Sequence, residues 1–282
     1  MAQNLAEKYE GQLAQAYTKD SVLAGKTNTD YSWNGVATIN VLTAVTQDLN
    51  DYNLTGTDGH GGNRYGEPTE LDDTKQTMTI TQDKSFAITI DRKNYDDQMM
   101  AKKTGTVTKA EIGEKVVPFF DKYALQKWIK GAGQHSSITA AVTKDTVLDM
   151  FIDARKKFVN ALIPLSTNDN FAYITTTAYG FLLRNPEFIS VEKLGNVILT
   201  NGEVGKCMSF RVVEVPDDYL GAKTQALFVH KKAVLAPTKL KELKVHDDAP
   251  GISGRLIEGR YRGDAFVLDV YKKGVLDSTI SG

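Results

Sequence analysis

The sequence predicts an α+β fold, in which helices and strands are interleaved without a regular βαβ repeat. Two kinds of pattern support this prediction. Apolar residues recur at helical spacing over residues 108–130 and 144–163, whereas residues 36–43 and 78–90 alternate apolar side chains with threonine, as strands do. After the second helical segment the chain alternates short strands with turns, around one short helix near residues 177–184. Helices and strands therefore mix along the whole chain.

The longest predicted helix covers residues 108–130. Thr108 and Glu111 have the spacing of a capping box, in which the hydroxyl and the carboxylate accept hydrogen bonds from free amides of the first turn. Pro118 lies in the middle of the segment, and a kink is expected there because proline has no amide hydrogen and crowds the preceding turn. The second long helix is expected to be capped by Thr143.

Residues 21–91 predict a long antiparallel β-hairpin. Thirteen threonines fall in this segment, and the glycine-rich residues 55–68 separate its alternating stretches as a flexible tip. Few apolar residues are expected near the end of the hairpin. A two-stranded hairpin is at best marginally stable in water, so this one needs a surface to lie on, in its own subunit or in another copy. The amphipathic residues 2–17 pose the same choice, as a helix packed on its own subunit or an arm that reaches a neighbour.

The composition limits the possible functions. The chain has 282 residues, of which 41% are hydrophobic and 24% charged, as in ordinary globular proteins. With 34 basic and 35 acidic side chains its formal net charge is -1, so it lacks the basic excess of a protein that grips DNA phosphates. The single cysteine, Cys207, excludes an internal disulfide framework and a cysteine metal cluster. The first residues lack a signal peptide's apolar stretch, and nowhere do apolar residues run for the ~18 positions of a membrane helix, so no membrane partner is expected.

Residues that carry chemistry do not gather into a recognisable pattern. The four histidines are scattered and form no ligand pair at helical spacing. The glycines of residues 56–62 lack the lysine and the strand–helix setting of a phosphate loop, and Asp48, Asp51 and Asp58 lack the closing glutamate of an EF-hand. Residues 262–264 spell the Arg-Gly-Asp tripeptide that integrins bind, but so short a match often arises by chance. We therefore expect no catalytic residue, no cofactor and no metal ligand.

The order of the predicted elements and several phrases of the sequence resemble one family. A terminal arm and a long hairpin are followed by a long helix, a second helix and a mixed sheet. The phrases that carry the likeness are residues 83–97, residues 111–128 with their central Val-Val-Pro, and residues 171–189, 202–216, 230–238 and 259–269. Together they resemble the major capsid proteins of tailed bacteriophages of the Hong Kong 97 type, in particular those of phages that infect Gram-positive bacteria.

This resemblance implies a division of the chain into five parts. They are an N-terminal arm over residues 1–34, an extended loop hairpin with flanking strands over 35–95, a peripheral domain with a long spine helix over 96–140, an axial domain over 141–240 and closing strands over 241–282. It also implies a structural, non-catalytic subunit that self-assembles into hexamers and pentamers of an icosahedral head around double-stranded DNA. The further partners that it implies are a separate scaffolding protein and a portal protein. The implied location is the virion capsid, assembled in the host cytoplasm.

Eight residues are the subunit contacts expected under this interpretation. They belong to the hairpin and to the segment that follows it: Asn53, Arg64, Tyr65, Glu67, Asp72, Lys75, Arg92 and Asp97. The charged residues among them are expected to set the register of neighbouring subunits and to steer their association. Three alternatives stay open: a related shell such as an encapsulin compartment or a gene-transfer particle, an enzyme with a dispersed site, and a carbohydrate- or surface-binding module of a virion.

Overall fold

The structure is a computed structural model that describes residues 20–33, 37–46, 48–54, 64–66, 68, 70–92, 104–138, 142–165, 168–185, 203–247 and 249–280. The chain divides into two compact units, a larger one of residues 1–34 and 80–282 and a smaller one of residues 35–79. Each is described by itself. Several sheets and a few helices alternate along the chain, which confirms the predicted α+β class.

A six-stranded mixed sheet forms the centre of the larger unit. Its strands lie in the order β4, β13, β8, β5, β7, β6. They span Gln134–Ile138 (β4), Asn170–Thr175 (β5), Glu203–Cys207 (β6), Phe210–Val215 (β7), Thr224–His230 (β8) and Val275–Ile280 (β13). β4 runs parallel to β13 and β5 runs parallel to β7, while the other neighbours are antiparallel. All six residues of β5 are buried, as expected for a strand that is covered on both faces.

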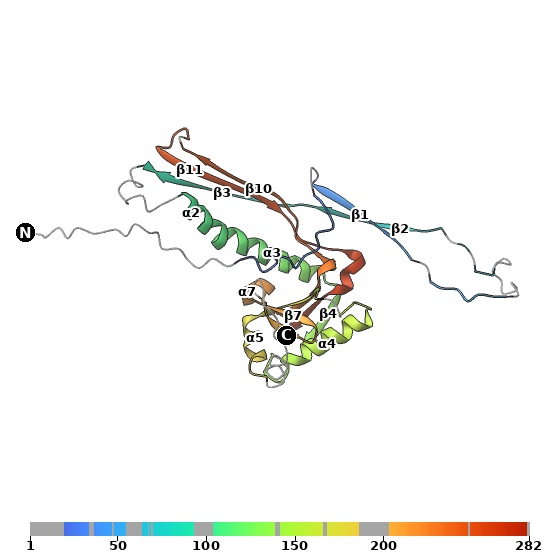
Figure 1. Cartoon of the computed structure of the whole chain (residues 1–282). Coiled ribbons are helices and arrows are strands. Elements are labelled where there is room, and N and C mark those ends of the chain that lie inside the picture. The colour runs from blue at the N-terminus through green and yellow to red at the C-terminus, as the bar shows by residue number, and fades with distance from the viewer. Residues whose placement is uncertain are drawn as a thin grey trace, which may run out of the picture. The chain divides into compact units, whose positions relative to one another are not determined.

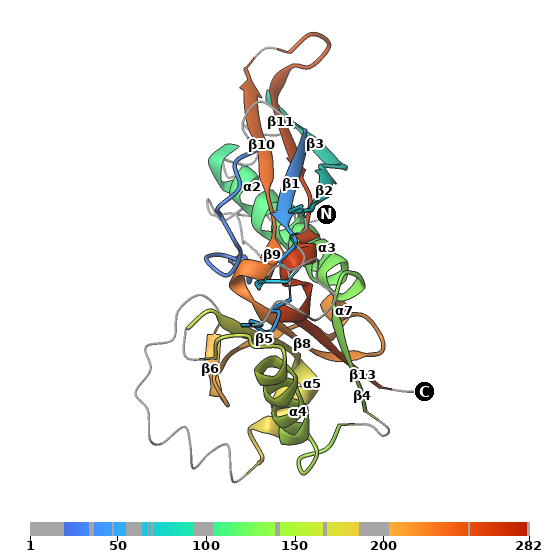
Figure 2. The same ribbon diagram turned by 90° about the vertical axis from the view of Figure 1, so that its right-hand side faces the viewer.

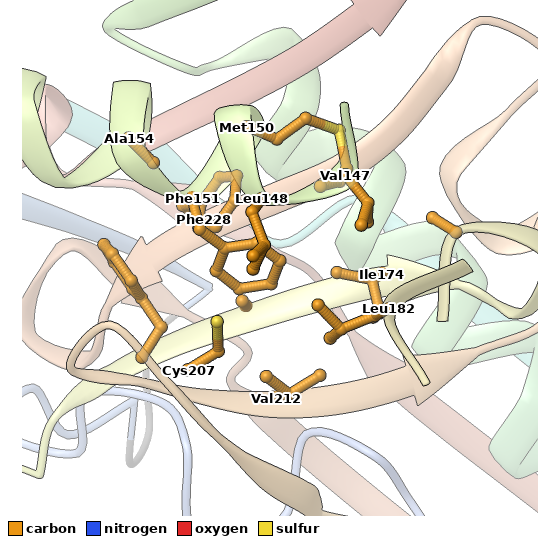
Figure 3. Packing of buried hydrophobic residues seen from close by; sticks show 14 of the residues in the cluster. Val147, Leu148, Met150, Phe151, Ala154, Ile174, Leu182, Cys207, Val212 and Phe228 are labelled. Carbon is orange, nitrogen blue, oxygen red and sulfur yellow. The ribbon is translucent and has the colours of Figure 1, made fainter. Parts of the chain in front are cut away.

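Two helices cover one face of this sheet. α4 (Val147–Asn160) and α5 (Thr176–Leu182) pack over apolar side chains of β5, β7 and β8 (Figure 3). The ring of Phe151 on α4 meets the ring of Phe228 on β8 edge-on, with their centroids 5.2 Å apart. This layer is the main apolar core of the larger unit.

The long helix covers the other face. Trp128 from its last part lies against Tyr173 of β5, and both side chains are fully buried. The indole N–H of Trp128 donates to the carbonyl of Leu235 at 3.2 Å, so the ring is anchored as well as packed. The six-stranded sheet is therefore the middle layer of three.

The long helix has three segments. α2 (Thr104–Glu111) leads into a π-helical turn, η1 (Ile112–Val116), and then into α3 (Val117–Lys130). At the end of the π-helical turn the amide of Val117 donates to the carbonyl of Ile112, five residues back. Pro118 follows directly, and the wider turn relieves the crowding between its ring and the preceding carbonyls. The predicted capping box is wrong, because the helix already begins at Thr104 and Thr108 is buried within it.

The second long helix is shorter than predicted. α4 begins three residues later than residue 144 and ends three residues before residue 163. Its N-cap residue is Thr146, and Thr143 lies one turn earlier, where its hydroxyl accepts a hydrogen bond from the Thr146 amide at 3.4 Å. After the helix Leu162 adopts a left-handed conformation with φ 57°, which prevents a further helical turn.

A three-stranded antiparallel sheet runs along the long helix in the larger unit (Figures 1 and 2). Its strands, in spatial order, are β10 (Thr238–His246), β11 (Gly254–Gly263) and β3 (Gln82–Asp91). Phe86 of β3 lies opposite Gly259 of β11, and its ring fills the space that a Cβ at this glycine would need. The pattern of residues 78–90 predicted part of β3, whereas β10 was not predicted.

Short elements complete the larger unit. They are α7 (Asp217–Leu220), the 3₁₀ turns η2 (Lys231–Ala233) and η3 (Asp269–Gly274), and the paired strands β9 (Val234–Leu235) and β12 (Phe266–Val267).

The smaller unit contains a two-stranded antiparallel ribbon of β1 (Thr38–Ala44) and β2 (Asp73–Thr79). The predicted returning strand of the hairpin is divided in the structure. β2 ends at Thr79, and β3 begins at Gln82 and pairs with β11 instead of continuing along β1. The ribbon is therefore shorter than the hairpin that the sequence predicted.

Replacing Phe151 by alanine is expected to lower the free energy of unfolding by about 3–5 kcal/mol, because the missing ring leaves a cavity under α4. The neighbouring Ile152 is about half exposed, so Ile152→Ala should change stability much less. Chemical denaturation of the unassembled subunit, followed by circular dichroism, measures both. Equal losses would contradict the packing described here.

His230 is expected to make the stability of the subunit depend on pH. Burial lowers the pKa of this histidine, and the nearby Lys232 acts in the same direction, against Asp169. The pKa in the folded state lies below the ordinary value of 6.5. The contribution of neutral His230 to the free energy of unfolding should therefore be fully present above pH 6.5, and it should be lost as the pH drops from there towards the folded-state pKa. His230→Asn removes the titrating ring and keeps an acceptor for the Lys232 amide. Denaturation midpoints at about pH 7 and about pH 5 should therefore differ less in this variant, and an unchanged pH dependence would contradict the assignment.

Candidate assembly surfaces

Threonine side chains join the two strands of the smaller unit. The hydroxyls of Thr38 and Thr79, which lie opposite each other, are 2.9 Å apart. The hydroxyl of Thr77 donates to the side-chain oxygen of Asn40 at 2.8 Å. These cross-strand contacts are exposed, so they stabilise the ribbon without giving it an apolar core.

The smaller unit exposes large apolar side chains along most of its described length. They are Leu42, Val45, Leu49, Tyr52, Leu54, Tyr65 and Leu71. Leu49 is 100% exposed, and Leu54 and Tyr65 are 74% and 77% exposed. Few apolar residues lie near the end of the hairpin, and the structure adds that those it describes there are exposed. Exposed apolar side chains spaced along a segment in this way are typical of a surface that binds another molecule.

Three of the expected contact residues lie together in the distal part of the smaller unit. The amide of Asn53 donates to the carbonyl of Arg64 at 3.1 Å, which brings the outgoing and returning segments side by side. The ring of Tyr65 meets that of Tyr52 edge-on, with centroids 5.1 Å apart. Backbone pairing therefore extends beyond β1 and β2.

The other expected contact residues are spread over the chain. The carbonyl of Asp72 accepts from the amide of Val45 at 2.8 Å, and Lys75 lies within β2. Arg92 belongs to the larger unit, and Glu67 and Asp97 lie outside the described residues. The contact residues expected from the sequence are mostly polar and do not include the exposed leucines. The position of these leucines in a threonine-rich, two-stranded segment could have indicated that they are exposed.

The smaller unit is acidic. Residues 35–79 contain seven carboxylates but only two basic side chains, Arg64 and Lys75. The carboxylates that the structure describes are all exposed: Asp48, Asp51, Glu70, Asp72 and Asp73. The rest of the chain has 32 basic and 28 acidic side chains, so the nearly neutral net charge conceals an acidic hairpin and a basic remainder.

A buried carboxylate joins three segments of the larger unit. Asp264 is 5% exposed and follows β11. One of its oxygens accepts from the amide and the hydroxyl of Thr81, at 2.8 and 2.7 Å. The other accepts from the Tyr123 hydroxyl and the Ala265 amide, both at 2.8 Å. Four donors satisfy the buried charge, and they fix the place at which the chain enters β3.

The same contacts exclude the integrin-binding interpretation of residues 262–264. A receptor would have to reach the carboxylate of Asp264, which is buried and already accepts four hydrogen bonds. The tripeptide is a structural corner between β11 and β12.

Ion pairs cover one face of the three-stranded sheet. Arg260 donates to both oxygens of Asp83, at 2.9 and 2.6 Å, and this hydrogen bonding holds the pKa of Asp83 below its usual value. Lys244 lies 2.7 Å from Glu242 on β10. Such exposed pairs contribute little stability individually. They give this face a balanced, strongly polar surface.

The described residues offer little for catalysis or metal binding. Among them, no three His, Cys, Asp or Glu side chains gather closely enough to hold a metal ion. Burial raises the pKa of Cys207 to about 12, so its thiol is not a nucleophile near neutral pH. Within the same residues, no helix combines the length and apolar character needed to cross a bilayer.

Comparison with known proteins gives a clear result at the level of structure. No family model and no curated protein matches the sequence. The capsid structure of cyanophage P-SCSP1u, however, matches with a TM-score of 0.75 at 14% identity, over 99% of this chain and 94% of that one. A structure from Mycobacterium phage Che8 matches with a TM-score of 0.73 at 15% identity, over 99% and 98% of the two chains. The chain has a phage-capsid fold.

The chain also matches the capsid structure of a particle that is not named as a phage. The capsid of an empty GTA particle matches with a TM-score of 0.65 at 11% identity, over 99% of this chain and 96% of that one. The coarser expectation from the sequence resemblance, a phage-capsid fold, is thus confirmed over nearly the full length. Identities this low establish the fold and transfer no residue roles.

Replacing Asp264 by alanine is expected to lower the free energy of unfolding by at least about 2 kcal/mol, because four donors, of which the Ala265 amide is buried, lose their acceptor. Asp264→Asn should cost less, since one oxygen remains. Asp83→Ala is the matched control, because it removes an exposed carboxylate near the same strand. Thermal denaturation of the three variants measures the difference, and an Asp264→Ala variant as stable as the control would contradict the network.

Proposed function

We propose that the chain is a major capsid protein, a structural subunit that self-assembles into hexamers and pentamers of an icosahedral phage head around double-stranded DNA. The observation that carries the proposal is the exposed apolar surface of residues 35–79, on a chain whose fold is that of phage capsids. A ribbon that buries so little of its own apolar surface is completed by a neighbouring copy. The proposal assigns no catalytic role to any residue and requires no cofactor.

Assembly of this kind works through several weak contacts. Each subunit of a closed shell touches several neighbours, so contacts that are weak singly become strong together. A stable pairwise interface commonly buries about 800 Å² on each partner. An extended ribbon offers such an area through its exposed side chains and its free strand edges, although Val41 and Met78 are already buried.

The domain assignment is part of the proposal. We assign residues 1–34 to an N-terminal arm, 35–95 to the extended loop, 96–140 to a peripheral domain, 141–240 to an axial domain and 241–282 to closing strands. The separate compact unit of residues 35–79 supports an extended loop. The pairing of β3 with β11 supports a contribution of the closing strands to the peripheral domain. The eight contact residues remain a prediction.

The proposed partners follow from enclosing DNA in a closed shell. A scaffolding protein sets the size of the shell, a portal protein occupies one vertex, and double-stranded DNA is packaged without sequence-specific binding. The proposed location is the virion capsid, after assembly in the host cytoplasm. A gene-transfer particle is the alternative, because the capsid of an empty GTA particle shares the fold. No observation favours an enzyme, an encapsulin compartment or a surface-binding module.

Replacing Leu49, Leu54 and Leu71 together by serine should leave a folded subunit that no longer builds shells, because the three side chains are exposed in the subunit and buried in the proposed contact. Sedimentation and negative-stain electron microscopy measure assembly, and circular dichroism checks the fold.

The matched control replaces three exposed apolar residues of the larger unit, Ile152, Val159 and Leu183, by serine. This control should still assemble. Normal shells from the hairpin variant would refute the role assigned to the hairpin.

A further inference from the structure

One end of the six-stranded sheet is basic. Three strands begin at this end, β5, β7 and β13, and two strands finish there, β6 and β8. The pairings of Asn170 with His230 and of Val275 with Val229 place these ends next to one another. The cations gathered here, called the basic end, are Lys206, Arg211, Lys231, Lys232, Lys272 and Lys273. They are exposed or half-buried.

Close contacts show that these residues form one surface. Lys206 lies opposite Arg211, and the Lys206 ammonium and an Arg211 guanidinium N–H donate to Asn168, at 3.2 and 3.3 Å. The amide of Lys231 donates to the carbonyl of the next residue, Asp169, at 2.8 Å. The turns η2 and η3 pack against each other. Three carboxylates lie in adjoining segments, Asp30, Asp169 and Asp269, so the six cations leave a positive excess.

The opposite end of the sheet carries charges of both signs. β5 and β7 finish there, and β7 continues into α7, which opens with Asp217 and Asp218. Both carboxylates are exposed, and Asp218 pairs with Lys122 of α3. Lys223 directly precedes β8 at this end, so these residues show no excess of one sign like that of the basic end.

Apolar side chains lie among the cations of the basic end. Val270 and Tyr271 on η3 are exposed directly before Lys272 and Lys273. A DNA backbone satisfies cations but offers nothing to exposed valine and tyrosine side chains. A protein segment with carboxylates and apolar side chains side by side fits such a surface better.

The smaller unit is a segment of that kind. Asp72 and Asp73 follow the exposed Leu71, and Asp48 and Asp51 flank the exposed Leu49. Its acidic excess mirrors the basic excess of the larger unit.

We propose that the basic end of one copy, at η2 and η3, is the docking surface for the acidic hairpin of a second copy. This inference rests on the proposed function and names the partner surface of the hairpin. The carboxylates of residues 72 and 73 face lysines of the turns, and the neighbouring leucines cover Val270 and Tyr271. Because the contact joins opposite charges at the protein surface, salt weakens it and slows association.

A charge exchange tests the pairing. Lys272→Glu with Lys273→Glu, and separately Asp72→Lys with Asp73→Lys, should each lower the initial rate of shell assembly by roughly tenfold at low salt. A single variant that combines all four substitutions should recover at least about half of the wild-type rate of shell assembly, since opposite charges again face each other. Light scattering and sedimentation measure assembly, and circular dichroism confirms that each subunit is folded.

The matched control is Lys109→Glu with Lys241→Glu, which makes the same change of charge at two exposed lysines outside the basic end. It should assemble within about twofold of wild type. An equal loss in this control, or no recovery in the fourfold variant, overturns the proposed pairing.

The remaining outcomes separate this inference from the proposed function. If the Lys272→Glu, Lys273→Glu variant builds normal shells while the Leu49, Leu54 and Leu71 serine variant does not, the hairpin contact stands and its docking site lies elsewhere. If that lysine variant builds normal shells that retain less double-stranded DNA, the basic end contacts the phosphate backbone and the inference is overturned. If the wild-type chain builds no shells at all, the proposed function itself fails.

Discussion

A two-stranded ribbon has no second layer of its own, and this geometric constraint governs how the chain is organised. In the larger unit the six-stranded sheet is covered by α4 and α5 on one face and by the long helix on the other, so its apolar side chains are removed from water. In the smaller unit hydroxyl contacts and backbone pairing hold β1 and β2 together, but leucine and tyrosine side chains stay in solvent. The burial that stabilises a β-ribbon has to come from elsewhere. For a chain with a phage-capsid fold, a second copy supplies it most economically, because the same surface is then present on every subunit.

The extent of the ribbon is set by a local competition for hydrogen bonds. The sequence alternates through residues 78–90, so periodicity alone continues the strand past Thr79. The carboxylate of Asp264 instead takes the amide and the hydroxyl of Thr81, and the chain beyond Thr81 pairs with β11. A partner distant in sequence thus divides one predicted strand into two strands of different sheets. Tyr123 of α3 also donates to Asp264, so the start of β3 is linked to the long helix through this carboxylate.

The fold class and most elements could be predicted because they depend on local patterns. The apolar spacing of α4 and the alternation in β7 and β11 are visible in any short window of the sequence. β10 escaped prediction because its Lys-Leu-Lys-Glu-Leu-Lys stretch is mostly charged, and an edge strand with exposed faces needs no apolar alternation. The π-helical turn before Pro118 and the left-handed Leu162 are conformations chosen by crowding between neighbours, which composition does not encode. For the proposed assembly surface, the sequence indicated the hairpin and its polar residues, whereas the exposure of the leucines between them is visible only in the structure.

The distribution of charge along the chain bears directly on the proposed self-association. A net charge of -1 would leave a uniform surface with little long-range repulsion and little orientation. Here the acidic side chains concentrate in residues 35–79 and the basic excess lies in the larger unit, so two copies attract each other in some orientations and repel in others. Screening acts within about 8–10 Å at ordinary ionic strength, so this selection operates during the last steps of approach. Apolar side chains then decide how long the two copies stay together, because the free energy of burying them does not arise from charges that salt screens. Orientation by charge and retention by apolar contact are therefore separable properties of the same surface, and an extended ribbon that carries both needs no deep pocket to recognise its neighbour.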